Sequence, residues 1–233
     1  MYINNNFSIR EMSRVVEENI NRELKYMSND FNYQQKEALE LFKKRIYLEE
    51  VIEETISFNK KLSWENLNEN LNLTTTAEEL VGVYKLRSDI YKQMNYIKEF
   101  PDIIESLNFD SFDKTSAIIY YKKQKEITGT CRFIFDSDKK LPSEEKLCFD
   151  DLREKYKYIG ELSRNMVKHK TKGLNMEFKY LMAGIHNVFN NNEINISVFV
   201  IKDNHYNMIS RFGGLEIIKT LNGYGNLEGT FYI

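Results

Sequence analysis

Residues 160–167 read GELSRNMV, and they combine the apolar end of a β-strand with two charged side chains, Glu161 and Arg164. Successive residues of a regular strand point to opposite faces of a sheet, so a spacing of three sends these two charges to different faces. Charged side chains on both faces of a strand are stable only where the surroundings of both faces are polar. GELSRNMV therefore indicates a strand that runs through a functional site.

The sequence around this strand alternates helical and strand-like segments from residue 76 onward. Thr76 and Glu79 have the spacing of a capping box, which predicts that a helix follows. Two apolar runs, residues 116–122 and 128–135, flank a polar turn and predict a β-hairpin. INISVFVIKD, LEIIKTL and GTFYI predict further strands, and GLNMEFKYLMAGIHNVFN and NHYNMISRFGG predict helices. The alternation favours an α/β or α+β fold with a mixed sheet flanked by helices.

Residues 1–75 predict helix and little else. The segments IREMSRVVEENINREL and QQKEALELFKKRIYLEEVIEETISF are rich in helix-favouring residues and contain neither Pro nor Gly. KLSWENLNENL predicts a further short helix capped by Ser63. We expect a helical N-terminal extension, residues 1–75, that covers a folded domain of residues 76–233. A helix pair that mediates dimerisation is the alternative.

The composition limits the class of protein. Of the 233 residues, 42% are hydrophobic, and 15 Tyr and 15 Phe can form a sizeable aromatic core. The net charge of −2 argues against a general nucleic-acid binder, because such proteins are usually strongly basic. Residues 1–80 contain 10 Lys and Arg against 15 Asp and Glu, whereas residues 81–233 contain 23 against 20. This asymmetry hints that the second part handles something acidic.

The sequence carries no targeting or metal-binding signal. The N-terminus MYINNNFSIR lacks the apolar core of a signal peptide, and no apolar run reaches the length of a membrane span. Cys131 and Cys148 lack metal-ligand spacing and do not make a disulfide framework, and the three histidines lie on different elements. We therefore expect a reduced, cytoplasmic protein without a metal site.

Four charged motifs follow one another in the second part of the chain. They are Arg87 with Tyr91, Asp110 with Asp113, Gly129 with Arg132, and Glu161 with Ser163 and Arg164. Taken singly, each has an ordinary structural explanation: a solvated helix residue, turn formers or helix caps, or a strand arginine that reaches solvent at a sheet edge. Their order is more informative than any one of them.

The ordered set resembles the acyl-homoserine-lactone (autoinducer) synthases and the related long-chain N-acyl amino acid synthases. Both are acyl-carrier-protein-dependent N-acyltransferases of the GNAT superfamily. Residues 141–152, LPSEEKLCFDDL, are similar to the family's segment between the last two motifs, with Phe149 at its aromatic position. HYNMISRFGGLEI is similar to the superfamily's helix–Gly–strand segment. The resemblance covers roughly residues 80–233.

The resemblance implies a GNAT-like acyl-CoA N-acyltransferase fold for residues 76–233, with a mixed central sheet flanked by helices. In this superfamily the strand that carries the last motif is bulged and splays away from its neighbour, and the acyl-pantetheine arm lies in the gap. A bulge would let Glu161 and Arg164 point toward the same region despite their spacing.

The resemblance also implies roles for individual residues. Glu161 would receive the proton of the amine through water, Ser163 and Arg164 would complete the catalytic set, and backbone N–H groups would stabilise the oxyanion. The residues expected to shape the pocket of the amine acceptor are Arg87, Tyr91, Asp110, Asp113, Arg132 and Phe149. The lysines after the strand, Lys168, Lys170 and Lys172, would meet the phosphopantetheine phosphate or an acidic carrier protein, with a solvated loop as the alternative.

The implied donor is acyl carrier protein with its phosphopantetheine thioester, acyl-CoA is an alternative, and no tightly bound cofactor is expected. Autoinducer synthases carry a Trp shortly after the Arg-aromatic pair, beside their S-adenosylmethionine acceptor, but YKQMNYIKEF has none and the single Trp is Trp64. An amino acid or another amine is therefore the expected acceptor, with Tyr96 as the candidate for an aromatic wall. The alternatives are an autoinducer synthase that uses S-adenosylmethionine for quorum-sensing signals, and a non-catalytic GNAT-like sensor or scaffold.

Overall fold

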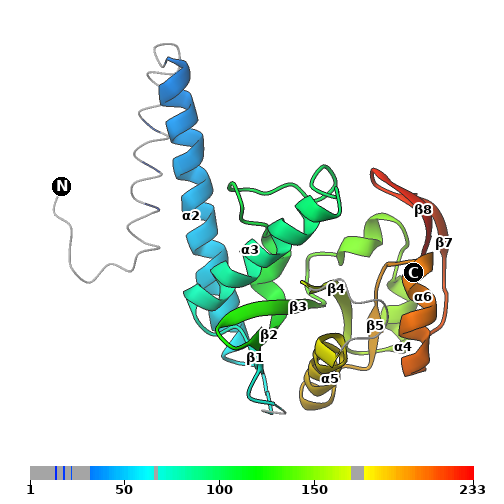
Figure 1. Ribbon diagram of the computed structural model, residues 1–233. Coiled ribbons are helices and arrows are strands. Elements are labelled where there is room, and N and C mark those ends of the chain that lie inside the picture. Colours follow the sequence, from blue (N-terminus) through cyan, green and yellow to red (C-terminus); the bar gives the residue numbers. More distant parts are fainter. Residues whose placement is uncertain (1–13, 15–17, 19–21, 23–31, 66–67, 169–175) are drawn as a thin grey trace. The chain divides into compact units, whose positions relative to one another are not determined.

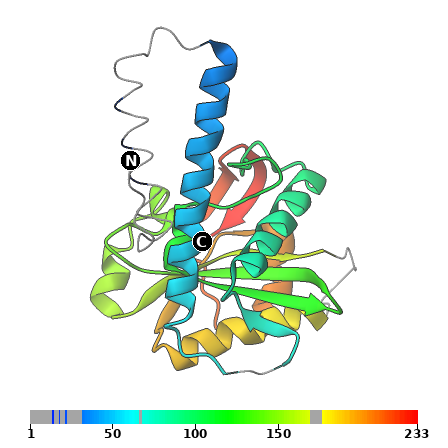
Figure 2. The same ribbon diagram turned by 90° about the vertical axis from the view of Figure 1, so that its left-hand side faces the viewer.

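The computed structural model describes residues 32–65, 68–168 and 176–233, together with the single residues Arg14, Glu18 and Arg22 (Figures 1 and 2). The chain divides into two compact units, Met1–Glu53 and Glu54–Ile233. Helix α2 (Tyr33–Asn59) begins in the first unit and ends in the second, and it confirms the longer of the two expected N-terminal helices. Most of the segment IREMSRVVEENINREL lies outside the described residues.

The second unit is built on a five-stranded mixed sheet. In spatial order its strands are β1 (Leu71–Leu73), β2 (Ser116–Lys123), β3 (Glu126–Phe135), β4 (Ile159–Val167) and β5 (Ile196–Val198). Neighbouring strands run antiparallel except β4 and β5, which are parallel. The β2–β3 pair is the predicted hairpin, and the mixed sheet confirms the predicted fold class.

Helices cover both faces of this sheet (Figures 1 and 2). Helix α3 (Ala77–Gln93) lies against one face and begins at the predicted capping box of Thr76 and Glu79. Helix α5 (Met176–Asn191) lies against the other face and supplies three buried side chains to the main apolar core, Leu181, Ile185 and Val188. Amphipathic helices of this kind are stabilised mainly by burying their apolar stripe against the sheet.

Strand alternation decides which side chains meet α5 and which meet α3. Cys131, Phe133 and Leu162 lie in the core with α5. Arg132 on β3 pairs with Ser163 on β4, so these two residues share the opposite face, the one that α3 covers. Glu161, two residues before Ser163, falls on that face as well.

Strand β4 contains the bulge that the resemblance implied. Ser163 pairs with Arg132, whereas Met166 pairs with Thr130, so Arg164 and Asn165 together oppose the single residue Cys131. Arg164 has a φ of 53°, in the left-handed region that residues other than glycine seldom adopt. Its side chain is thereby turned to the α3 face, where it bonds to Tyr91. The bulge resolves the alternation problem posed by GELSRNMV.

Strands β4 and β5 separate after three paired residues, the last pair being Glu161 with Val198. Beyond this point β4 continues, while the segment that follows β5 turns away and forms β6 (Ile201–Lys202). Strand β6 belongs to a second sheet, in the order β6–β8–β7, with β7 at Thr220–Tyr224 and β8 at Leu227–Tyr232. The single strand expected for INISVFVIKD is therefore wrong. Its apolar run is continuous, and periodicity cannot show where a strand changes partners.

Short helical turns connect the strands. They are η1 (Ser111–Thr115), η2 (Pro142–Glu145), α4 (Asp150–Lys155), α6 (Asp203–Ile209) and η3 (Ser210–Phe212). Within LEIIKTL only the last two residues enter β7, so most of that expected strand is irregular.

The two compact units meet between residues 53 and 54, whereas the boundary expected from the sequence lies between residues 75 and 76. The described residues of KLSWENLNENL, 61–65 and 68–71, form no helix, and Leu71–Leu73 forms β1 at the edge of the sheet. The side chain of Asn59 also ties the end of α2 to the sheet, because its Oδ1 accepts from the N–H of Ile118 at 3.2 Å. The sequence Leu-Asn-Leu is too short to show strand alternation, and its place in the sheet depends on the partner strand.

Among the described residues, no helix is long and apolar enough to cross a membrane, and no cluster of His, Cys, Asp and Glu could hold a metal ion. Cys131 is buried, Cys148 is exposed, and both are free thiols. Burial raises the pKa of the Cys131 thiol, which makes it a poor nucleophile.

Candidate active site

A cavity of about 460 Å³ lies where β4 and β5 separate, and the segments that continue from both strands line it. One wall is β4 from Glu161 to Val167, and residues 199–202 form the opposite wall. Apolar side chains make up much of the lining: Met94, Phe112, Leu162, Met166, Val167, Phe178, Phe199, Val200, Ile201, Met208, Ile209, Leu227 and Phe231. The charged groups on β3 and β4 that line it are Arg132, Glu161 and Arg164.

Arg132 joins β4 to the turn that carries the two aspartates. Its Nη1 lies 2.6 Å from Asp110 Oδ1 and 3.0 Å from Asp113 Oδ1, and its Nε donates to Ser163 Oγ at 2.9 Å. Asp110 is the N-cap of η1 and Asp113 is its third residue, so a local capping box presents both carboxylates toward the sheet. The Asp-x-x-Asp spacing thus serves the turn and the arginine together.

Arg164 extends the same network toward α3. Its Nη1 donates to Tyr91 Oη at 2.6 Å and to Asn108 Oδ1 at 3.1 Å, and its Nη2 donates to Asp110 Oδ2 at 2.9 Å. The guanidinium also lies over the rings of Tyr91 and Phe100, at 5.1 and 4.8 Å from their centroids. Three hydrogen bonds and two ring faces fix this side chain in the cavity wall.

Arg87 and Asp113 form the buried base of the network. Both side chains have no solvent exposure, and Arg87 Nη1 lies 3.0 Å from each carboxylate oxygen of Asp113. Neither residue lines the cavity. They hold Arg132 and Asp110 in place, which is a supporting role.

Asp110 and Arg132 stabilise each other's charged forms. Burial by itself would raise the pKa of Asp110, but the guanidiniums of Arg132 and Arg164 hold it well below its usual range. Burial by itself would lower the pKa of Arg132, and Asp110 and Asp113 raise it instead. The alternating charges therefore form a fixed electrostatic frame around the cavity.

Glu161 lies outside this chain of ion pairs. It is 3% exposed, and its Oε2 accepts from the N–H of Ser143 at 2.9 Å and from Ser143 Oγ at 2.5 Å. Burial raises the pKa of Glu161, and the hydrogen bonds from Ser143 oppose that rise. A carboxylate with a raised pKa in a cavity wall has the properties of a general base.

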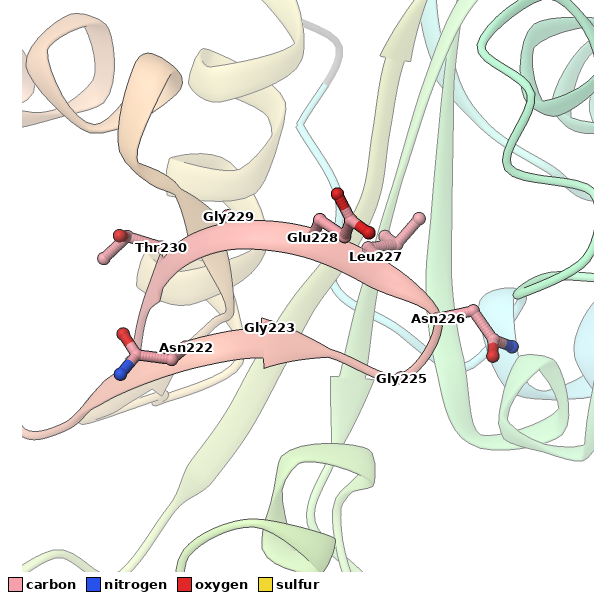
Figure 3. A pocket seen from close by; sticks show the side chains of 8 residues that line it. All are labelled: Asn222, Gly223, Gly225, Asn226, Leu227, Glu228, Gly229 and Thr230. Atoms are coloured by element: carbon pink, nitrogen blue, oxygen red, sulfur yellow. The ribbon is translucent and has the colours of Figure 1, made fainter.

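The β7–β8 hairpin contributes Tyr224 and Leu227 to the cavity lining. Its turn has Gly225 at the first central position with a φ of 58°, as a type II′ turn requires. Glu99 Oε2 accepts from the N–H of Asn226 at 2.6 Å and ties the loop after α3 to this turn. A second hollow, of about 490 Å³, is lined only by hairpin residues and contains no member of the charged network (Figure 3).

The sequence matches the family described as N-acyl amino acid synthase FeeM over residues 82–230. The chain belongs to this family. It is therefore an acyltransferase that transfers an acyl group to an amine, which decides against the non-catalytic alternative. A comparison with curated proteins gave no match.

Solved structures show that the family resemblance extends to the fold. The FeeM-family chain resembles FeeM, an N-acyl amino acid synthase from uncultured soil microbes, with a TM-score of 0.55 and 14% identity over 70% of this chain and 86% of that one. It also resembles the AHL synthase LasI, with a TM-score of 0.52 and 18% identity over 71% of this chain and 89% of that one. The GNAT-like fold expected from the sequence is confirmed.

The structure brings most of the expected site residues of this acyltransferase together and separates others. Those brought into the network or the cavity wall are Arg87, Tyr91, Asp110, Asp113, Arg132, Glu161, Ser163 and Arg164. Phe149 is fully buried in an apolar cluster with Ile134 and Leu141 and does not line the cavity, so it is a core residue. An aromatic position in a family pattern does not distinguish core packing from substrate contact.

The basic loop is described only at its first residue. Lys168 forms an ion pair with Glu126 and does not line the cavity, while Lys170 and Lys172 lie outside the described residues. Sequence reasoning missed Asn108, Ser143, Phe100 and the hairpin residue Tyr224. Asn108 lies in a loop, and Ser143 lies in η2 within LPSEEKLCFDDL, a segment in which the resemblance singled out only Phe149. The partners of both residues are distant in sequence.

Proposed function

We propose that this acyltransferase moves a fatty acyl group from the pantetheine thioester of acyl carrier protein to the amine of an amino acid. The observation that carries the proposal is the largely apolar cavity between β4 and β5, with Glu161, Ser163 and Arg164 in its wall. Such a cavity suits an acyl-pantetheine arm, and the charged wall suits a polar acceptor. The amine attacks the thioester directly, without a covalent enzyme intermediate.

The residues on β4 support each step of this reaction. Glu161 receives a proton from the ammonium group through water, and the neutral amine then forms a bond to the thioester carbon. Arg164 and Asn165 have no ladder partner at the bulge, so their backbone N–H groups are candidates for the oxyanion donors. The carbon–sulfur bond breaks, the thiolate leaves, and it takes up the proton that the nitrogen loses as the amide forms.

The charge of the network supports an acceptor that carries a carboxylate. Arg87, Arg132 and Arg164 contribute three positive charges, and Asp110 and Asp113 contribute two negative ones. The difference is one positive charge, and it is unchanged when the other charged residues of the cavity lining, Lys202 and Glu161, are added, because their charges are opposite. A buried excess charge favours a ligand of opposite charge.

The absence of a Trp shortly after Arg87 and Tyr91 supports an acceptor other than S-adenosylmethionine. Trp64 does not line the cavity, whereas Tyr96 does, which supports Tyr96 as the candidate for an aromatic wall. Mass spectrometry of lipid extracts from expressing cells tests the proposal. The masses of new N-acyl amino acids would identify the amino acid acceptor and the length of the acyl chain. Release of methylthioadenosine from S-adenosylmethionine with N-acyl-homoserine lactone would identify the other acceptor instead.

The lysines that follow β4 are proposed to meet the carrier protein. Replacing Lys168, Lys170 and Lys172 with Glu should raise the apparent Michaelis constant for acyl carrier protein about tenfold or more at low salt, because three favourable charges become repulsive. The kcat should change little. The matched control reverses Lys36, Lys43 and Lys44 on α2 and should leave the constant unchanged. An unchanged constant in the loop variant would reject a carrier-protein contact there.

A further inference from the structure

We infer that Ser143 is a positioning residue that holds the Glu161 carboxylate with one oxygen reserved for the proton of the acceptor. The inference rests on the proposed function, in which Glu161 is the base. Ser143 lies in η2, 18 residues before Glu161, in the segment LPSEEKLCFDDL, in which the resemblance singled out only Phe149.

Both hydrogen-bond donors of Ser143 converge on the same oxygen. The backbone N–H and the hydroxyl donate to Glu161 Oε2 at 2.9 and 2.5 Å, and Ser143 itself has no solvent exposure. Within the part of the chain that the structure describes, no hydrogen bond reaches Oε1 of Glu161. One oxygen is therefore anchored by charge-assisted bonds, and the other is left to accept a proton.

Ser143 is itself fixed by bonds that do not involve Glu161. The neighbouring Glu144 accepts from Arg153 through both carboxylate oxygens at 2.6 Å, and its Oε2 also accepts from the N–H of Leu141 at 2.7 Å. Arg153 in turn donates to both oxygens of Asp136 at 2.8 Å. A bidentate bridge on each side of one guanidinium makes this segment a rigid support.

The hydroxyl also balances the burial of Glu161. Burial raises the pKa of this carboxyl, and hydrogen bonds from Ser143 to the ionised form lower it. Loss of the hydroxyl should raise the pKa further, while the backbone donor remains. A base works only while it is ionised, so the activity that depends on it is lost as pH falls through its pKa. A higher pKa moves that loss to higher pH.

The test is the pH dependence of kcat/KM in Ser143→Ala. We expect the acidic limb to move up by about one pH unit, in line with a lost hydrogen bond to a charged group, and the rate to recover toward wild type at high pH. The matched control is Ser88→Ala, which removes a buried serine hydroxyl that donates to Asp102 at 2.7 Å and lies outside the cavity lining. Its acidic limb should coincide with that of the wild type.

An acidic limb that stays in place in Ser143→Ala, or a loss that is equal at every pH, would overturn the inference. If that variant does not fold, Ser143→Cys, which keeps a weaker donor, must shift the limb in the same direction. Titration of ¹³C-labelled glutamate side chains by NMR follows Glu161 without any assay. If the pKa of Glu161 rises in Ser143→Ala but the wild type shows no activity, the role of Ser143 is supported and the proposed function is rejected. If the wild type is active and the pKa of Glu161 does not rise in Ser143→Ala, only the role of Ser143 is rejected.

Discussion

Asp113→Asn is expected to destabilise the second unit by about 3–5 kcal/mol, the usual cost of breaking a buried ion pair on one side. Asp113 has no solvent exposure and accepts from Arg87, from Arg132 and from the N–H of Asp110. Arg87 is equally buried, and its Nε and Nη2 have no hydrogen-bond partner in the described structure. Without the carboxylate, a fully buried guanidinium keeps its charge and loses its counterion.

Chemical denaturation of the purified variant measures this loss as a lower midpoint with an unchanged slope. The matched control is Asp136→Asn, which breaks a bidentate pair with Arg153 where both side chains are part-exposed, at 22% and 29%. That change should cost about 1 kcal/mol or less, because solvent screens the pair. A loss below about 1 kcal/mol for Asp113→Asn would contradict the view that the network is a structural base of the site.

Glu161→Gln is expected to lower kcat/KM about 10²–10⁴-fold, the contribution typical of a general base. The amide has the size of the carboxyl and its oxygen can still accept from Ser143, so the fold should be retained. The variant loses only the ability to take the proton of the amine. Initial rates of thiol release, followed with a thiol reagent, give the comparison.

The control for Glu161→Gln is Glu177→Gln, a change of the same type at a buried glutamate of α5 that does not line the cavity. It should retain activity close to that of the wild type. Thermal melts of both variants separate a chemical effect from unfolding. Full activity of Glu161→Gln would remove this residue from the mechanism and leave the network without an assigned base.

The sequence predicts elements that depend on neighbouring residues better than elements that depend on distant partner strands. The capping box of Thr76 and Glu79 and the β2–β3 hairpin follow from neighbours a few residues apart, and both occur as expected. Strand β1 and the split of INISVFVIKD between two sheets depend on partner strands far along the chain. Local periodicity holds no information about such partners.

The candidate site likewise contains residues that could be predicted from the sequence and residues that could not. Its charged residues were found because they recur in a family order, and the bulge at Arg164 explains how GELSRNMV turns two charges to one face. Ser143 and Asn108 contact Glu161 and Arg164 on β4 only because segments distant in sequence fold back onto this strand. Phe149 shows the opposite case, because the family pattern placed it at the site and the structure places it in an apolar cluster.

The most direct test of the account is mass spectrometry of the products that the purified full-length protein forms from acyl carrier protein, loaded with fatty acyl chains, and a mixture of amino acids. We expect an N-acyl amino acid whose formation equals the release of free carrier-protein thiol and is strongly reduced by Glu161→Gln. Thiol release without any N-acylated product, or no turnover of any acyl carrier protein or acyl-CoA by the folded protein, would contradict it.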